Sequence, residues 1–194
     1  LLFSLLAGCV YIVNDIFDRE EDRNHLIKQH RPIASGQVSV RIAKIVAIGG
    51  FLIVGGVALW LDWVFFLILV GYLVQNLAYS TILKNVFLID IFIIGSGFVL
   101  RAIAGVAIIS APSSPWLLLT VFLAAFLLAS GKRRAEFIKY DNEARTSLDD
   151  FTEEFSVFLL FLSATTLLVV YSLYTFFSRR TIMMLTIPFA YYSV

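Results

Sequence analysis

The chain of 194 residues is 60% hydrophobic and only 15% charged, with a mean hydropathy of +0.89. This composition excludes an ordinary soluble domain, in which roughly a quarter of the residues are charged. A net charge of +1, without a basic surface interleaved with aromatic residues, gives no sign of a nucleic-acid partner, and we expect none. The single cysteine, Cys9, cannot form an internal disulfide.

Apolar runs of about 15 to 25 residues follow one another along the chain, and helices of this length cross a hydrocarbon core of roughly 30 Å. The runs lack the alternation of a transmembrane β-strand. They predict spans at about 1–14, 42–60, 63–80, 86–109, 115–131, 155–177 and 181–194. The sequence therefore predicts an all-α, polytopic integral membrane helix bundle of about seven spans, forming a single domain over 1–194. We expect the first and last runs to be cut, because the chain begins and ends within apolar sequence.

Lysine and arginine divide the connecting loops into two groups. If the spans alternate, loops 14–41, 81–85 and 132–154 share one side and hold most of the basic residues. The loops on the other side hold only Arg179 and Arg180. The positive-inside rule then places the longer loops in the cytoplasm.

An acidic stretch follows the first apolar run, in the sequence VNDIFDREEDRNHLIKQHRPIASG at 13–36. If the helix continues, Asp15, Asp18 and Asp22 fall at i, i+3 and i+7 on one face, with Asn14 beside them. Like charges at this spacing repel one another, and a divalent cation removes that repulsion. Mg²⁺ is the expected cofactor, because it prefers oxygen ligands and is usually held by one or two carboxylates together with substrate phosphates. We predict that all four residues bind the metal and that the three carboxylates are catalytic.

Basic groups come next, with His25, Lys28 and Arg31 at every third residue before Pro32. This spacing places three hydrogen-bond donors along one side of a helix or extended turn. Cations that follow a metal-binding acidic stripe are typical of a diphosphate site. We predict that Lys28 and Arg31 bind substrate, and that His25 is a phosphate or structural contact and not a catalytic base.

The stretch NDIFDREEDRNHLIKQHRPIASG resembles the first aspartate-rich motif, N-D-x-x-D-x-x-x-D, of the UbiA superfamily of membrane-embedded prenyltransferases. The resemblance implies that the carboxylates bind Mg²⁺ and a diphosphate substrate at the cytoplasmic mouth of a bundle of nine helices. A second stretch, AYSTILKNVFLIDIFIIGSGFVLRAIAGVAI, resembles the segment around the family's next cytoplasmic turn. There the resemblance implies that Tyr79 and Lys84 face the phosphates.

Arg101 lies near the middle of the predicted span 86–109, where insertion of an arginine costs roughly 2.5–3.5 kcal/mol. It therefore needs a partner. Two candidates are Asp90, about three turns nearer the cytoplasm on the same helix, and a substrate anion within the bundle. We predict a substrate-binding role for Arg101, with a purely structural ion pair as the alternative.

The second acidic motif of the superfamily, roughly D-x-x-x-D where the sixth span meets the cytoplasm, is replaced here by SGKRRAEFIKYDNEARTSLDDF. Lys132, Arg133 and Glu136 give one acid among bases. This departure, together with GFVLRAIAGVA, resembles the decaprenyl-phosphate phosphoribosyltransferase branch of the superfamily.

That branch implies Mg²⁺-dependent transfer of 5-phosphoribosyl from phosphoribosyl diphosphate to a polyprenyl (decaprenyl) phosphate. The expected setting is a bacterial plasma membrane, with the active site on the cytoplasmic side and a role in cell wall biosynthesis. The additional phosphates would be bound by basic residues, and Glu136 would be a further metal ligand or would accept a ribose hydroxyl. These basic residues are Lys28, Lys84, Lys132, Arg133 and Arg145.

Two alternatives remain open. A conventional UbiA prenyltransferase, moving an isoprenoid from a prenyl diphosphate lipid to an aromatic or other small acceptor, needs the same first motif. Its discriminating feature, the second acidic motif, is weak here. The other alternative is a non-catalytic transporter or channel, but Asp90 is the one carboxylate that continues from the acidic face into the spans.

Overall fold

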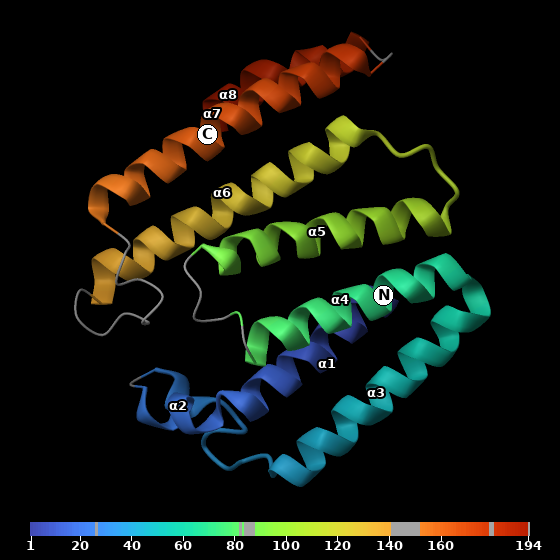
Figure 1. Ribbon diagram of the computed structural model, residues 1–194, viewed down its shortest axis with the longest axis vertical. Helices are drawn as coiled ribbons and strands as arrows, with labels where there is room; N and C mark the ends of the chain where they lie inside the picture. Colours follow the sequence, from blue (N-terminus) through green and yellow to red (C-terminus); the bar gives the residue numbers. More distant parts are fainter. Residues whose placement is uncertain (26, 82, 84–87, 141–151, 179–180, 194) are drawn as a thin grey trace. The chain divides into compact units, whose positions relative to one another are not determined.

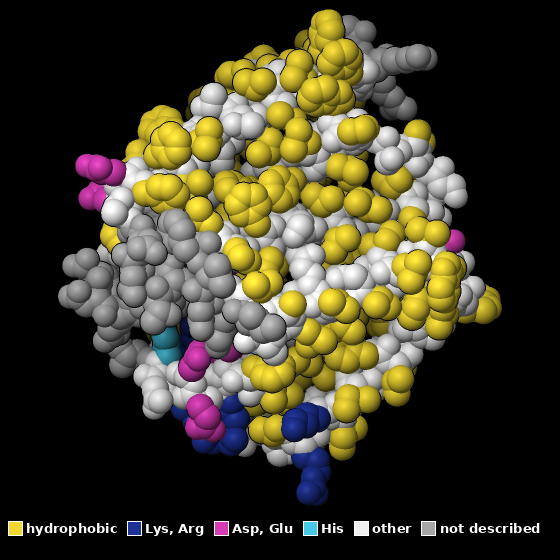
Figure 2. All heavy atoms as spheres, viewed as in Figure 1, with side chains coloured by type: hydrophobic (Ala, Val, Ile, Leu, Met, Phe, Trp, Pro, Cys, Tyr) yellow, Lys and Arg dark blue, Asp and Glu magenta, His cyan; other side chains and the backbone are white. Residues whose placement is uncertain are grey.

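The computed structural model describes the whole chain except residues 26, 82, 84–87, 141–151, 179–180 and 194 (Figure 1). Over these described ranges the regular structure is entirely helical. Five helices are long and apolar enough to cross a membrane, namely α3 (Val40–Leu61), α4 (Trp63–Thr81), α5 (Ile89–Ile108), α6 (Pro115–Tyr140) and α7 (Glu153–Phe177). Figure 2 shows apolar side chains over much of the visible face, with charged side chains in a few small groups. The prediction of an all-α membrane fold is confirmed.

The first and last apolar runs are shorter than a membrane span. The first, α1 (Leu2–Phe17), has 16 residues. The predicted span 181–194 is not one α-helix, because it consists of a 3₁₀ segment, η4 (Thr181–Thr186), and a short helix, α8 (Ile187–Ser193). Pro188 accounts for this interruption: it has no backbone N–H to donate, and a helix tolerates proline only in its first turn.

The chain divides into two compact units, Leu1–Thr81 and Ile82–Val194. In the first unit α1 packs against α3 and α4, through buried side chains such as Leu6, Val10, Val54 and Leu69. Gly50 of α3 lies directly against the Cys9 side chain of α1, and a Cβ atom at Gly50 would collide with the Cys9 Sγ atom. The absence of a side chain at Gly50 therefore permits this close approach of the two helices.

A short turn at Asp62 joins the end of α3 to the start of α4. Asp62 Oδ1 accepts the Phe65 N–H at 2.7 Å, which satisfies a backbone donor at the start of α4. Trp60 and Trp63 flank this turn and are 82% and 61% exposed. Tryptophan is typical of the membrane–water interface, so these two rings mark the position of the turn in the bilayer.

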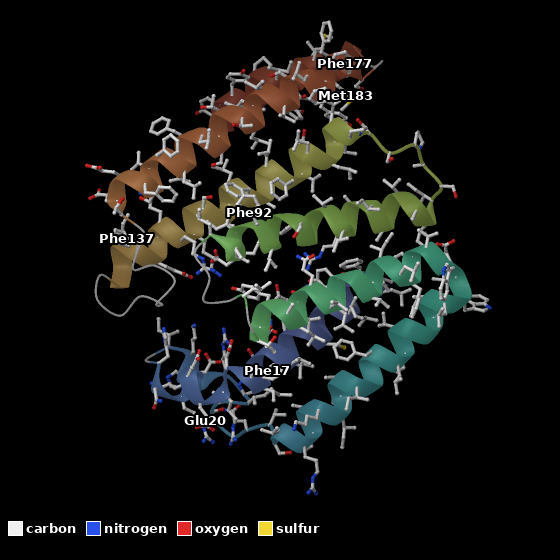
Figure 3. The ribbon with its side chains drawn as sticks, in the orientation of Figure 1. Phe17, Glu20, Phe92, Phe137, Phe177 and Met183 are labelled. Atoms are coloured by element: carbon white, nitrogen blue, oxygen red, sulfur yellow. The ribbon has the colours of Figure 1, made fainter. Side chains whose placement is uncertain are left out.

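The second unit contains α5, α6 and α7, each packed on the next along the chain. Its core is a cluster of Ile91, Phe126, Ala129 and Leu159. Phe92, labelled in Figure 3, meets the Phe126 ring edge to face with the centroids 5.1 Å apart. Thr152 caps α7 by accepting the Phe155 N–H at 3.1 Å.

At the other end of the second unit, Trp116 at the start of α6 stacks on Phe177 at the end of α7, with the ring centroids 5.7 Å apart. The observed end of α6 also differs from the end predicted for this span. The helix continues through Tyr140, nine residues beyond the predicted end at 131. Lys132, Arg133 and Glu136 are therefore helical residues, and their spacing along α6 decides which of them can meet.

Candidate functional site

The acidic motif spans the junction between α1 and α2 (Arg19–Asn24). Asp18 separates the two helices, with φ −85° and ψ 1°. The helical hydrogen bonds nevertheless continue through it, because Asp18 N–H donates to Asn14 O and Asp22 N–H donates to Asp18 O, each at 2.8 Å. The chain thus keeps a nearly helical path, and the spacing that predicted a shared face for Asp15 and Asp22 holds.

Arg31 joins these two carboxylates. Its Nη1 atom donates to Asp15 Oδ1 and to Asp22 Oδ2, both at 2.9 Å. The Asp22 side chain is only 3% exposed, whereas the side chains of Asp15 and Arg31 are 31% and 40% exposed. A guanidinium group of the protein therefore lies between two of the three carboxylates predicted to bind Mg²⁺.

Electrostatics also group the three carboxylates together. Burial raises the pKa of Asp15 above its ordinary value, Arg31 opposes that rise, and the charges of Asp22 and Asp18 raise the pKa further. Asp18 therefore lies close enough to Asp15 for the two charges to interact. The charges of the three carboxylates are therefore coupled to one another.

The segment after α2 folds back to bring Arg31 to the acids. A 3₁₀ turn, η1 (Lys28–His30), directly precedes Arg31. Arg23 Nε donates to the Ala34 carbonyl at 3.0 Å, and Ala34 is buried. Gly36 has φ +83°, a left-handed conformation that favours glycine. These features hold the backbone of the residues that follow Arg31.

Two residues of the same stretch have local roles. The His25 Nδ1 atom accepts the backbone N–H groups of Ile27 and Lys28, at 3.2 and 3.4 Å, so this imidazole helps to form the turn. Glu20, labelled in Figure 3, is 76% exposed and lies 3.4 Å from the Arg23 guanidinium. His25 was predicted to be a phosphate or structural contact, and its hydrogen bonds here are contacts within the turn.

Asn14 is positioned by a residue that the sequence did not indicate. Ser80 of α4 donates its hydroxyl to Asn14 Oδ1 at 2.5 Å, and Ser80 is 8% exposed. The Ser80 hydroxyl also lies 2.9 Å from the Asn76 carbonyl of its own helix. The sequence offered only a weak signal for this contact, because Asn76 and Ser80 are simply two polar residues four positions apart on an apolar helix. Tyr79, predicted to face phosphate, is half-buried on the same turn.

The donor set of this acidic site suits Mg²⁺. Within the described ranges, no group of three or more His, Cys, Asp or Glu side chains is arranged to hold a metal ion. However, Asp15 Oδ1 and Asp22 Oδ2 converge on one nitrogen of Arg31, so a single cation can bridge them. One or two carboxylates, completed by water and substrate phosphates, are the usual protein ligands of Mg²⁺.

The second unit holds a separate group of charges on α5 and α6. Asp90 and Arg133 are each 5% exposed and form an ion pair between the two helices. Arg133 also pairs with Glu136, one turn further along α6, whose side chain is 33% exposed. The guanidinium that was predicted to bind substrate is thus enclosed between two carboxylates of the protein.

This pairing removes one of the two partners considered for Arg101. The Asp90 carboxylate belongs to Arg133, and the Arg101 guanidinium lies over the Phe98 ring, 5.2 Å from its centroid. Lys132 is exposed on α6. Lys84 and Arg145, also predicted to bind substrate, lie outside the described residues.

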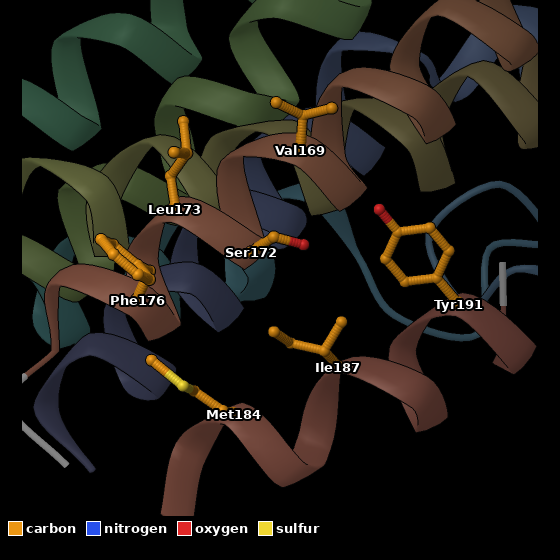
Figure 4. Close-up of a pocket in the computed structure, with 7 residues that line it drawn as sticks. All are labelled: Val169, Ser172, Leu173, Phe176, Met184, Ile187 and Tyr191. Carbon is orange, nitrogen blue, oxygen red and sulfur yellow. The ribbon is translucent and has the colours of Figure 1, made fainter. Parts of the chain in front are cut away.

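A cavity of about 380 Å³ lies in the second unit, between α7 and the segment formed by η4 and α8 (Figure 4). Its lining is mostly apolar, with two hydroxyl-bearing residues and no charged residue among the described side chains. It consists of Val169, Ser172, Leu173, Phe176, Met184, Ile187 and Tyr191. Without a cation in its lining, this cavity does not suit a phosphate group.

A model of a known protein family matches most of the chain. The model of the UbiA prenyltransferase family matches residues 1–137, which include the acidic motif and the Asp90–Arg133–Glu136 group. The chain belongs to the UbiA prenyltransferase family.

Several similar proteins are named decaprenyl-phosphate phosphoribosyltransferase. The chain is 36% identical to the decaprenyl-phosphate phosphoribosyltransferase of Mycolicibacterium smegmatis, over 93% of this chain and 58% of that protein. It is 34% identical to the decaprenyl-phosphate phosphoribosyltransferase of Corynebacterium glutamicum, over 91% of this chain and 54% of that protein. The chain thus spans little more than half the length of these curated relatives.

A solved structure shares the UbiA fold. A UbiA homologue from Archaeoglobus fulgidus, bound to GPP and Mg²⁺, matches with a TM-score of 0.84 at 20% identity. The match covers 97% of this chain and 69% of the archaeal chain. At this identity the likeness establishes the fold.

Proposed function

We propose that this UbiA-family protein is a Mg²⁺-dependent membrane transferase that moves 5-phosphoribosyl from phosphoribosyl diphosphate to a polyprenyl phosphate. The observation that carries the proposal is the 36% identity, over 93% of the chain, to a relative named decaprenyl-phosphate phosphoribosyltransferase. The exposed Lys132 in the α6 segment, where the resemblance leads one to expect a second acidic motif, supports this choice over an aromatic acceptor.

The acidic site in the first unit is the proposed donor site. Asn14, Asp15, Asp18 and Asp22 would hold Mg²⁺, whose charge, when bound, stabilises the leaving diphosphate. Arg31 and Lys28 follow the acids on the fold-back segment and would bind diphosphate oxygens. Guanidinium groups suit this task because they donate two parallel hydrogen bonds to phosphate. We place this site on the cytoplasmic side, where the positive-inside rule puts the basic loops.

Other residues of the chain are also proposed to contact substrate. Glu136 is held by Arg133 and partly exposed, which leaves its carboxylate able to accept a ribose hydroxyl. Lys132 is exposed and would bind a phosphate. Further proposed phosphate contacts are Tyr79, Lys84, Arg101 and Arg145.

The proposed chemistry needs little acid–base catalysis from the protein. Departure of the diphosphate leaves positive charge on the anomeric carbon, and the Lys and Arg side chains stabilise the negative charge that leaves with the diphosphate. The polyprenyl phosphate is already an anion, so its attack requires no strong general base. This agrees with the structural role of His25 in its turn.

The test uses membranes that contain the protein, Mg²⁺, a polyprenyl phosphate and radiolabelled phosphoribosyl diphosphate. We expect label to enter the lipid phase and to disappear when Mg²⁺ is chelated. A matched sample carrying Asp18→Asn should show no transfer. If the wild-type sample yields no labelled lipid at saturating Mg²⁺, the phosphoribosyltransferase proposal is wrong.

A conventional prenyltransferase is the second candidate. It is favoured by one observation, the shared fold with an archaeal homologue whose structure contains GPP and Mg²⁺. A parallel sample supplies a radiolabelled prenyl diphosphate and an aromatic acceptor. Transfer in that sample alone would identify this second activity.

A further inference from the structure

We propose that Arg31 is an exchangeable counter-ion of the acidic site. In the metal-free protein it pairs with Asp15 and Asp22, and it leaves these carboxylates for the phosphates of the donor when a divalent cation binds. The inference deepens the proposed function, and rests on its metal–diphosphate site. Its consequence is that metal and diphosphate strengthen each other's binding through one side chain.

The position of the Arg31 guanidinium supports the exchange. One atom, Nη1, lies 2.9 Å from an oxygen of each carboxylate, and so stands between the two groups that a bridging cation would use. A divalent ion bound there would place a second positive centre within a few ångströms of Nη1. Two positive charges this close repel one another near a protein surface, so a bound metal ion disfavours the guanidinium at its present position.

Burial shows which partner stays and which moves. Asp22 is 3% exposed, so its carboxylate is fixed inside the first unit. Arg31 is 40% exposed and reaches the carboxylates from the open side. Its backbone is extended at φ −60° and ψ 141°, and the segment beyond it is held by the bond from Arg23 Nε to the Ala34 carbonyl. The exchange therefore needs rotation of one long side chain, with the backbone in place.

The coupling follows from the charges. A buried carboxylate without a counter-charge is unfavourable, so Asp22 retains a cation in both states, first Arg31 and then the metal. Metal binding alone leaves the displaced Arg31 without its two carboxylates. A diphosphate gives Arg31 a new anionic partner, so metal binding becomes more favourable when diphosphate is present. By linkage, diphosphate binding is strengthened by metal to the same degree.

The first experiment measures the reactivity of Arg31 in the wild-type protein. Purified protein is treated with phenylglyoxal, which modifies arginine, and the modified positions are quantified by mass spectrometry. Arg41, which is exposed at the start of α3, is the internal reference. We expect slow modification of Arg31 without metal, severalfold faster modification with Mg²⁺ alone, and slow modification again with Mg²⁺ plus methylenediphosphonate. Arg41 should react at one rate throughout.

The second experiment measures the affinity of the protein for Mn²⁺ alone, by electron paramagnetic resonance of the unbound ion. Arg31→Gln removes the competing cation, and we expect its Mn²⁺ affinity to rise about tenfold, within the usual range of coupling between sites. Arg31→Lys should retain the wild-type affinity. Arg41→Gln changes the net charge equally and should leave the affinity unchanged.

The outcomes separate this inference from the proposed function. If Mn²⁺ binds but Arg31→Gln binds it no more tightly than wild type, or if Mg²⁺ leaves the reactivity of Arg31 unchanged, the exchange is wrong and the transferase proposal stands. If neither wild type nor Arg31→Gln binds Mn²⁺, the metal site and the exchange both fail. The labelling needs no variant, so a misfolded Arg31→Gln would still leave the exchange tested.

Discussion

Arg133 of α6 and Asp90 of α5 form an ion pair whose side chains are only 6% and 8% exposed. The pair joins two helices that share the core cluster around Ile91 and Phe126. Removing one partner of a buried pair leaves the other charge without compensation, at a typical loss of about 3–5 kcal/mol. The pair is therefore a sensitive point in the stability of the second unit.

We predict that Arg133→Gln lowers the melting temperature of the detergent-solubilised protein far more than Lys132→Gln, because Lys132 is exposed. The double variant Asp90→Asn/Arg133→Gln should recover much of the loss, since it leaves no buried charge unpaired. Thermal melting of wild type, Asp90→Asn, Arg133→Gln and the double variant forms a double-mutant cycle, with Lys132→Gln as the control. Additive losses from Asp90→Asn and Arg133→Gln would show that the two side chains are not coupled.

The carboxylates of the first motif should be essential for turnover. Asp18→Asn and Asp22→Asn preserve shape and remove charge, so we expect each to reduce transfer by on the order of 100-fold or more. Glu20→Gln is the matched control, because Glu20 is 76% exposed and pairs only weakly with neighbouring arginines. Rates are measured at saturating Mg²⁺ with folding checked by melting. Full turnover by either Asp variant under these conditions would contradict the metal-site assignment.

Ser80 should act through Asn14. Ser80→Ala removes the hydroxyl that donates to Asn14 Oδ1, and we expect metal affinity to fall by about 10-fold, as is typical when the support of a metal ligand is lost. Ser80→Thr should restore part of the affinity. Thr81→Val is the control, since the Thr81 hydroxyl bonds to the Leu77 carbonyl of its own helix. Mn²⁺ titration of the three variants measures their metal affinities. If Ser80→Ala binds Mn²⁺ as tightly as wild type, Ser80 does not support metal binding and only packs against its neighbours.

Arg101 should matter more than an arginine at the membrane surface. We predict that Arg101→Gln lowers transfer severalfold, because its charge lies well inside α5 and, under the proposed function, binds a substrate phosphate. Arg41→Gln, at an exposed position, should have almost no effect. Comparing kcat and KM for phosphoribosyl diphosphate separates a binding defect from general damage. Equal effects of both variants would make Arg101 a structural residue.

Two adjacent glycines of α3 offer a matched test of the helix packing in the first unit. Gly50→Ala places a Cβ atom against the Cys9 Sγ atom, and such overpacking typically destabilises by about 1–3 kcal/mol. Gly49→Ala meets no atom within 4 Å and should stabilise slightly, because alanine favours helix by about 1 kcal/mol over glycine. The double variant Cys9→Ala/Gly50→Ala should recover stability. Melting temperatures report each effect, and equal values for the two glycine variants would refute the close approach.

Sequence spacing predicted the helices and the shared face of Asp15 and Asp22, because helical periodicity is local and survives the junction at Asp18. It also singled out Arg31, but as a phosphate ligand. Its pairing with both acids depends on the fold-back after α2, which brings together residues nine and sixteen positions apart. Such a tertiary contact has no periodic signal.

Other features were missed for different physical reasons. Hydropathy alone predicted a final span through Pro188, although proline cannot continue a helix in its interior. Ser80 was missed because one small hydroxyl on an apolar helix is usually bonded to its own backbone. Asp90 was considered as a partner of Arg101 on the same helix, whereas it pairs with Arg133 of α6, forty-three positions along the chain, and α5 packs on α6.

The positions of Trp60, Trp63 and Trp116, the three tryptophans of the chain, limit which optical methods can follow ligand binding. Trp63 and Ser80 are separated by most of α4, about 25 Å at 1.5 Å per residue. The emission of Trp60 and Trp63 should therefore respond strongly to quenchers carried by lipids at the depth of the α3–α4 turn. The arrival of metal or diphosphate at the acidic motif of the same unit should leave the emission of these two residues almost unchanged. A fluorescent reporter of the reaction would have to be introduced beside the carboxylates, for example by Phe17→Trp, since Phe17 is exposed at the end of α1.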